Sequence, residues 1–218
     1  MTAFYHLAAQ DFDTTFAQAM MAGTYVQLPR CPMCKTAIRE RVAPLVIEWD
    51  LGSDQIADFT WPEVLNELVV TERVRSAFLA ERFKGVGFEP VEMIEKADLR
   101  RPRNRAIAHN RVRLPYDGPP LWSLAVRSSC RLDLEKSGRS LVRECEACKR
   151  TRMIVHDSKA TLVIRPESWE GTDFFRIQEM GGGVFVGENV RNAIFEHGFT
   201  NVDMKQRGYL PIASKGTF

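Results

Sequence analysis

Two pairs of cysteines carry the clearest chemistry in this chain. Cys31 and Cys34 form one C-x-x-C motif, Cys145 and Cys148 form a second, and a lysine follows each motif. Zn²⁺ prefers four ligands at tetrahedral corners and binds thiolate well, and two intervening residues let a tight turn aim both sulfurs at one ion. The four cysteines therefore predict one structural zinc ion with Cys31, Cys34, Cys145 and Cys148 as ligands.

The long separation of the two motifs leaves other interpretations open. More than a hundred residues lie between Cys34 and Cys145, whereas paired zinc motifs are usually about 15 to 20 residues apart. A redox-active dithiol in each half is one alternative, and four unrelated buried thiols are another. The fifth cysteine, Cys130, is expected to be an ordinary buried residue.

The sequences that follow the two cysteine motifs resemble each other. In each, an apolar L-V-I run is followed by an Asp-Phe step, by an E-x-V-R-x-A segment and by a run that starts at glycine and ends at methionine, Gly85–Met93 in the first and Gly198–Met204 in the second. Thr71 and Gly187 occupy helix N-cap positions, and Gly198 is suited to a left-handed C-cap. We expect an internal duplication in which each copy contains strand, strand, helix and strand.

This pattern predicts an α+β protein of two similar halves joined by the zinc site. The expected segments are an N-terminal half over residues 1–98, a connecting insert over 99–143 and a C-terminal half over 144–218, packed as one compact unit. Because loop-closure entropy grows only logarithmically with length, one metal can join two such distant motifs.

The insert contains the only strong charge run. Six arginines and no acidic residue lie between Leu99 and Arg113, in a chain whose net charge is only +2. The run between Arg100 and Arg113 could bind nucleic acid or an acidic protein, or it could be the solvated face of a half-buried strand.

Composition excludes several classes of protein. The chain has 218 residues, of which 44% are hydrophobic and 27% charged, so it can bury a core and is not a disordered protein. It lacks the roughly 18 to 20 uninterrupted apolar residues of a membrane helix and has no signal-peptide pattern at its N-terminus. We expect a cytoplasmic protein with no membrane partner.

No arrangement of residues indicates catalysis. The histidines His6, His109, His156 and His197 are scattered and stand in no known catalytic motif. The carboxylate pairs Glu167/Glu170 and Asp54/Asp58 are expected to lie in solvated loops. The sequence thus predicts a protein that is not an enzyme.

The combined motifs resemble a known bacterial family. The paired C-x-x-C motifs, the repeated E-x-V-R-x-A segment, the Asp-Phe steps and the aromatic-rich loop Pro166–Phe175 are similar to the double-CXXCG motif family, over roughly residues 25–210. Lys35 and Lys149 stand where that family has glycine. The resemblance implies that Cys31, Cys34, Cys145 and Cys148 are the motif cysteines.

The same resemblance implies a function. Members of this family are described as cytoplasmic immunity proteins that protect the producing cell from contact-delivered polymorphic toxins, which implies a cognate toxin protein as the partner. The hypothesis is therefore a non-enzymatic, zinc-stabilised toxin-neutralising protein. The alternative is a zinc-containing nucleic-acid-binding regulator that uses the run from Arg100 to Arg113.

Overall fold

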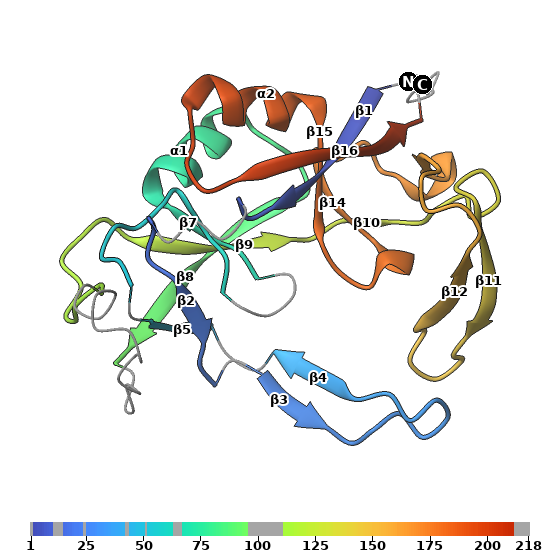
Figure 1. The fold of residues 1–218 in the computed structure, drawn as a ribbon, viewed down its shortest axis with the longest axis horizontal. Coiled ribbons are helices and arrows are strands. Elements are labelled where there is room, and N and C mark those ends of the chain that lie inside the picture. Colours follow the sequence, from blue (N-terminus) through green and yellow to red (C-terminus); the bar gives the residue numbers. More distant parts are fainter. Residues whose placement is uncertain are drawn as a thin grey trace.

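The computed structural model describes residues 2–10, 15–23, 25–41, 44–50, 52–62, 67–95 and 111–211. Within these ranges the chain is mostly β-strand, with the α-helices α1 (Glu72–Ala80) and α2 (Glu188–His197) and the short 3₁₀ helices η2 (Pro166–Ser168) and η3 (Gln178–Met180). The predicted α+β class is confirmed, and both helices begin where the sequence indicated. Figure 1 shows the two helices near each other on one side of the molecule.

The strands form two six-stranded sheets. The first has the order β2-β5-β8-β9-β7-β6. Its strands are β2 (Ala19–Met21), β5 (Leu45–Trp49), β6 (Phe59–Thr60), β7 (Val69–Thr71), β8 (Val86–Ile94) and β9 (Leu121–Val126). The second has the order β10-β14-β15-β1-β16-β13. Its strands are β1 (Thr2–Ala8), β10 (Ser129–Cys130), β13 (Leu162–Val163), β14 (Phe174–Ile177), β15 (Val184–Gly187) and β16 (Asp203–Leu210).

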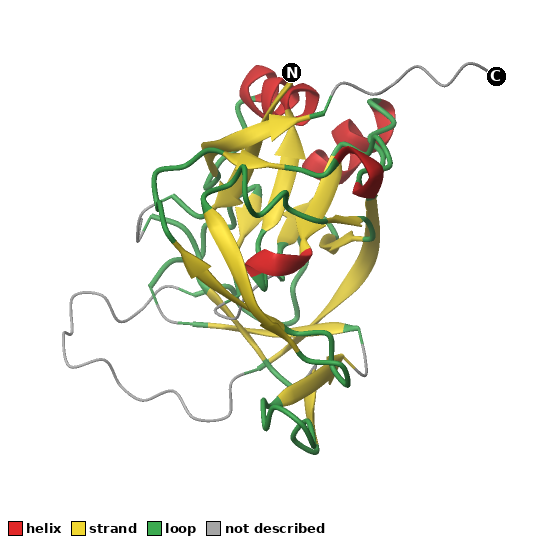
Figure 2. Ribbon diagram, turned by 90° about the vertical axis from the view of Figure 1, so that its right-hand side faces the viewer, coloured by secondary structure: helices red, strands yellow, loops and turns green. Residues whose placement is uncertain are grey.

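Two hairpins extend from these sheets. One consists of β3 (Tyr25–Leu28) and β4 (Ile38–Arg41), and the other of β11 (Arg139–Glu144) and β12 (Thr151–Val155). Both hairpins project away from the helices (Figure 1), and strands make up most of the body between them (Figure 2).

The two sheets repeat one arrangement of strands. The order β6-β7-β9-β8-β5 in the first matches β14-β15-β1-β16-β13 in the second, with three antiparallel pairings followed by one parallel pairing in each. The registers also correspond, since Trp122 lies opposite Val70 and Pro90 while Tyr5 lies opposite Val186 and Gln206. The origin of this likeness by duplication stays a prediction.

The central strand of each sheet comes from outside the segment that suggested the repeat. In the first sheet it is β9, which belongs to the expected insert, and in the second it is β1, from the opposite end of the chain. An arginine of each helix stacks on the aromatic residue of the corresponding central strand, Arg75 on Trp122 and Arg191 on Tyr5. Each half therefore contains a central strand in addition to the strand, strand, helix and strand predicted from its repeat segment.

One hydrophobic cluster joins the halves. Phe59, Val74 and Phe78 from the first half pack with Phe174 and Val190 from the second, and each of these side chains is at most 1% exposed. Burial of each large apolar side chain contributes about 1.5–3 kcal/mol, so this shared core is a major source of cohesion between the halves. Two further clusters lie within the individual sheets.

The Asp-Phe steps make reciprocal contacts between the halves. The carboxylate of Asp58 accepts a hydrogen bond from the backbone N–H of Thr200 at 3.1 Å, and that of Asp173 accepts one from the N–H of Lys84 at 2.8 Å. The phenylalanine that follows each aspartate donates its own N–H to the carbonyl of the same Thr200 or Lys84. Each half thus binds the loop that follows the other half's helix.

The expectation that Asp58 lies in a solvated loop is wrong. Asp58 is only 8% exposed, and besides Thr200 it accepts hydrogen bonds from Thr71 at 3.1 Å and from Arg73 at 2.7 Å. A buried carboxylate is stable only when donors compensate for its lost hydration, and these donors come from parts of the chain that meet only in the folded state.

We predict that Asp58→Ala lowers the free energy of unfolding by about 2–3 kcal/mol, because it removes the buried acceptor that Thr71, Arg73 and Thr200 share. Urea denaturation measures this change. Asp54→Ala is the matched control, since Asp54 is exposed in the same loop and its loss should change stability by less than about 0.5 kcal/mol. Equal effects of the two substitutions would contradict the structural role of Asp58.

Candidate metal centre

Each C-x-x-C motif forms a tight turn in the connection between the two strands of a hairpin. In the first, the N–H of Cys31 donates to the carbonyl of Thr36 at 3.0 Å and the N–H of Lys35 donates to that of Cys31 at 2.9 Å. The second repeats this pair of bonds, from Cys145 to Arg150 at 2.9 Å and from Lys149 to Cys145 at 2.8 Å. The two turns thus have the same backbone hydrogen-bond pattern.

The lysine after each motif adopts the conformation that glycine normally supplies. Lys35 has a φ of 59° and Lys149 a φ of 56°, both in the left-handed region. A side chain in this region costs about 1–2 kcal/mol relative to a right-handed conformation. The turns therefore keep their shape at a local energetic cost, which the surrounding structure offsets.

We expect Lys35→Gly and Lys149→Gly each to raise the free energy of unfolding by about 0.5–1 kcal/mol, because glycine relieves the left-handed strain and loses part of that gain to chain entropy. Equilibrium denaturation of the metal-loaded protein measures the change. Lys159→Gly serves as the control, because Lys159 is an exposed loop residue whose φ is not positive, and there glycine should be neutral or destabilising. Destabilisation by all three substitutions would contradict backbone strain at Lys35 and Lys149.

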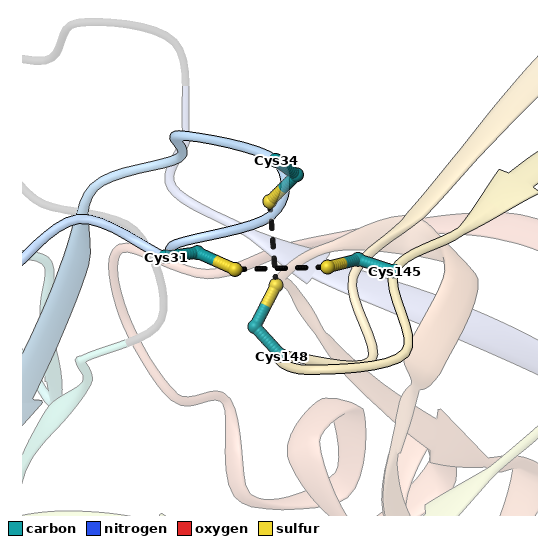
Figure 3. A group of neighbouring side chains, drawn as sticks. All are labelled: Cys31, Cys34, Cys145 and Cys148. Carbon is teal, nitrogen blue, oxygen red and sulfur yellow. Dashed lines mark hydrogen bonds between the residues drawn. The ribbon is translucent and has the colours of Figure 1, made fainter.

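The two turns bring their four sulfur atoms together. All four Sγ atoms lie within 4.8 Å of one another. The Cys31–Cys145 sulfur distance is 3.6 Å and the Cys34–Cys148 distance is 3.5 Å, and both pairs join one hairpin to the other. Figure 3 shows the side chains pointing from the two turns toward a common centre.

These distances fit a tetrahedral metal site rather than disulfides. Four sulfurs at the usual 2.3 Å from zinc are about 3.8 Å apart along each edge of the tetrahedron, whereas a disulfide bond is close to 2.05 Å. Cys31 and Cys145 are buried, and Cys34 and Cys148 are half-buried. The prediction that these four cysteines lie close enough to hold a metal ion is confirmed.

The surroundings of Cys34, Cys145 and Cys148 shift the pKa values of these thiols in different directions. The Thr36 hydroxyl, 3.2 Å from the sulfur of Cys34, together with the Thr36 N–H lowers the pKa of Cys34 to about 6. The backbone N–H of Cys148 lowers the pKa of Cys145. The Arg150 N–H also acts to lower the pKa of Cys148, but burial and the neighbouring thiols outweigh it and raise this pKa to about 11. A thiolate at Cys34 gives a cation its first ligand near neutral pH.

The position of the turns does not suit thioredoxin-like redox chemistry. That chemistry places the dithiol at the N-terminus of a helix, whose dipole stabilises the thiolate. Here β3 and β4 flank the first motif, and β11 and β12 flank the second. The turn geometry therefore favours a metal site.

Cys130 lies apart from this group, as expected. Its side chain is 1% exposed, its sulfur is 3.6 Å from the carbonyl of Arg176, and burial raises its pKa to about 12. It behaves as a small core residue and provides a natural control for the other four cysteines.

The remaining candidate residues lie elsewhere. Ser140 contacts the His156 ring at 2.8 Å, His6 packs on Phe185, and His197 stacks on Phe199. Glu167 and Glu170 are exposed. Most of the basic run, with Arg100, Arg101, Arg103, Arg105 and His109, lies outside the described residues, although Arg111 is described and pairs with Glu95 at 2.9 Å.

Sequence reasoning missed the polar groups that fix the hairpins. At the base of the first hairpin, Tyr25 donates to Glu67, which also pairs with Arg41 at 3.6 Å. Arg131 joins Glu144 of the second hairpin, at 3.0 Å, to the buried Glu179 of the body, at 2.9 Å. These partners are far apart in the sequence, so no local signal reveals them.

Comparison with known proteins adds no further assignment: no protein-family model matches this chain, and neither does any curated protein.

Among the described residues, no helix combines the length and the apolar character needed to cross a membrane.

Proposed function

We propose that Cys31, Cys34, Cys145 and Cys148 hold one structural zinc ion in a non-enzymatic binding protein. The observation that supports this proposal is the meeting of four sulfurs from two hairpins at zinc-like spacing. Four thiolates fill the tetrahedral shell of zinc and leave no open position for a substrate, which is the arrangement of a structural rather than a catalytic site. Zinc also resists redox change, so the link would persist in a reducing cytoplasm.

The metal would act as a cross-link between the halves. The two hairpins are two-stranded ribbons in which the side chains described in β3, β11 and β12 are half-buried or exposed, and such ribbons are marginally stable alone. A structural zinc ion contributes about 10 kcal/mol or more to the folding of the unit that binds it. Metal binding would therefore hold both hairpins in fixed positions relative to the two sheets.

The partner that we propose is a cognate bacterial toxin, which the chain would neutralise by binding in the cytoplasm of the producing cell. The motif resemblance supports this, and so does the surface of the hairpins, where aliphatic side chains are exposed. Leu141, Val142, Ile154 and Val155 on the second hairpin and Met33 within the first motif are each 47–51% exposed. Apolar side chains are thus exposed on both faces of the second hairpin, since Leu141 and Ile154 lie on opposite faces in the strand register, and exposed apolar surface is typical of protein interfaces. The proposal also includes an origin of the two halves by duplication.

We predict one zinc ion per chain by elemental analysis, and loss of that ion in Cys34→Ser and in Cys145→Ser, because each substitution removes one ligand from a different hairpin. The apparent free energy of unfolding should fall by several kcal/mol in both. Cys130→Ala should keep the zinc and is the matched control. Metal-free protein, or metal loss from Cys130→Ala as well, would contradict the site.

Growth rescue tests the proposed partner. We expect co-expression of this chain with its cognate toxin to restore growth, and a Leu141→Asp/Ile154→Asp variant with intact zinc and thermal stability to lose rescue, since a buried charge disrupts an apolar interface. Failure to rescue, combined with DNA or RNA affinity that falls linearly with the logarithm of salt concentration, would instead support the nucleic-acid regulator.

A further inference from the structure

A groove beside β16 has a volume of about 400 Å³. One wall is β16 from Gln206 to Tyr209, and the facing wall is the loop from Ser158 to Thr161 that leads into β13. Arg139, at the base of the second hairpin, and Met180 complete it. The groove thus lies where the C-terminal sheet meets the second hairpin.

The groove exists because β13 pairs with only part of β16. Leu162 and Val163 pair with Gly208 and Tyr209, and before Leu162 the chain leaves the strand. Over Asp203–Arg207, β16 has β1 on one side and, among the described strands, none on the other. An open strand edge offers backbone donors and acceptors in a row, which an extended chain can use to add a strand.

Three cations surround this edge. Arg139, Lys159 and Arg207 line the groove, and no lining residue is acidic among those described. Lys159 and Arg207 are exposed and belong to no ion pair of the described part of the chain, and Arg139 is oriented by a hydrogen bond to the carbonyl of Ser137 at 2.6 Å. The carboxylate of the nearby Asp157 accepts a hydrogen bond from the backbone N–H of Lys159 at 2.8 Å. The groove is therefore suited to an anionic ligand.

The corresponding edge of the first sheet is closed to an added strand. Pro90 of β8 takes the register position that Gln206 has in β16, since each lies opposite the aromatic residue of its central strand. Proline has no N–H to donate and is typical of protected strand edges. The two halves thus differ at the position where an incoming strand would need a donor.

We propose that this groove binds an extended acidic peptide segment of a partner protein, which pairs with the free edge of β16 and places its carboxylates against Arg139, Lys159 and Arg207. The inference rests on the proposed function, because it gives the partner a surface and a chemistry. Met180, 39% exposed, and Tyr209, 40% exposed, supply apolar contacts for the alternate side chains of such a strand. A nucleic-acid backbone fits less well because phosphodiesters have no N–H to donate to the strand's carbonyl groups.

The test uses the zinc-loaded full chain and a fluorescein-labelled peptide, Glu-Val-Glu-Val-Glu-Val, in a fluorescence anisotropy titration at low salt. We expect saturable binding that is lost when glutamine replaces every glutamate in the probe. Arg207→Ala and Lys159→Ala should each weaken binding about tenfold, because each removes a charge-assisted contact. Lys84→Ala, at an exposed lysine outside the groove, should leave the affinity unchanged.

Gln206→Pro tests the strand pairing itself, because it gives β16 the residue that β8 has at the same register. We expect this variant to keep its zinc and to lose peptide binding by at least about tenfold. If it does not fold, Gln206→Ala, which keeps the N–H, and the two charge variants still decide the question, since Gln206→Ala should bind normally.

Three results would overturn the inference: equal binding of the glutamate and glutamine peptides, binding that none of the groove variants changes, or tighter binding of labelled hexathymidine at the same cations. The growth-rescue assay distinguishes failure of the groove inference from failure of the proposed function. Rescue that persists in the Arg207→Ala/Lys159→Ala variant would refute the groove and leave the toxin-binding function standing.

Discussion

The meeting of four cysteine sulfurs within 4.8 Å is the constraint that links every larger feature of this protein. Each pair of sulfurs is placed by a turn of fixed backbone geometry, and each turn is held by a hairpin that belongs to a different half of the chain. A tetrahedral site tolerates little displacement, because metal–sulfur distances vary by only about 0.2 Å. The hairpins, and therefore the sheets from which they extend, must keep nearly fixed relative positions for the four sulfurs to share one ion.

Packing between the halves provides much of that fixed geometry. The shared core holds both helices and both Asp-Phe steps, and the two aspartates bind loops of the opposite half. Gly85 shows how close this contact is, since a Cβ at that position would lie 2.2 Å from the carbonyl oxygen of Phe174. The shared core and the cysteine group therefore lie at different places on the same two halves.

The likeness of the halves makes their differences informative. Both present a projecting hairpin, a central strand with a stacked arginine and a strand that is only partly covered at its outer edge. In the first half, proline stands at that edge, and Arg41 of the hairpin pairs with Glu89 of β8 at 3.0 Å. In the second half, glutamine stands there beside three cations. The two halves thus differ at this edge in both backbone donors and charge.

The sequence alone determined what depends on local chemistry. The C-x-x-C spacing identified the four cysteines, and the N-cap positions Thr71 and Gly187 marked the starts of both helices. Only the tertiary structure decided that β1 and β9 are the central strands, that Asp58 is buried, and that Arg139, Lys159 and Arg207 share a groove. The physical reason is that turns and helices are specified by residues a few positions apart, whereas strand pairing, burial and clustered charge depend on residues that only the folded chain brings together.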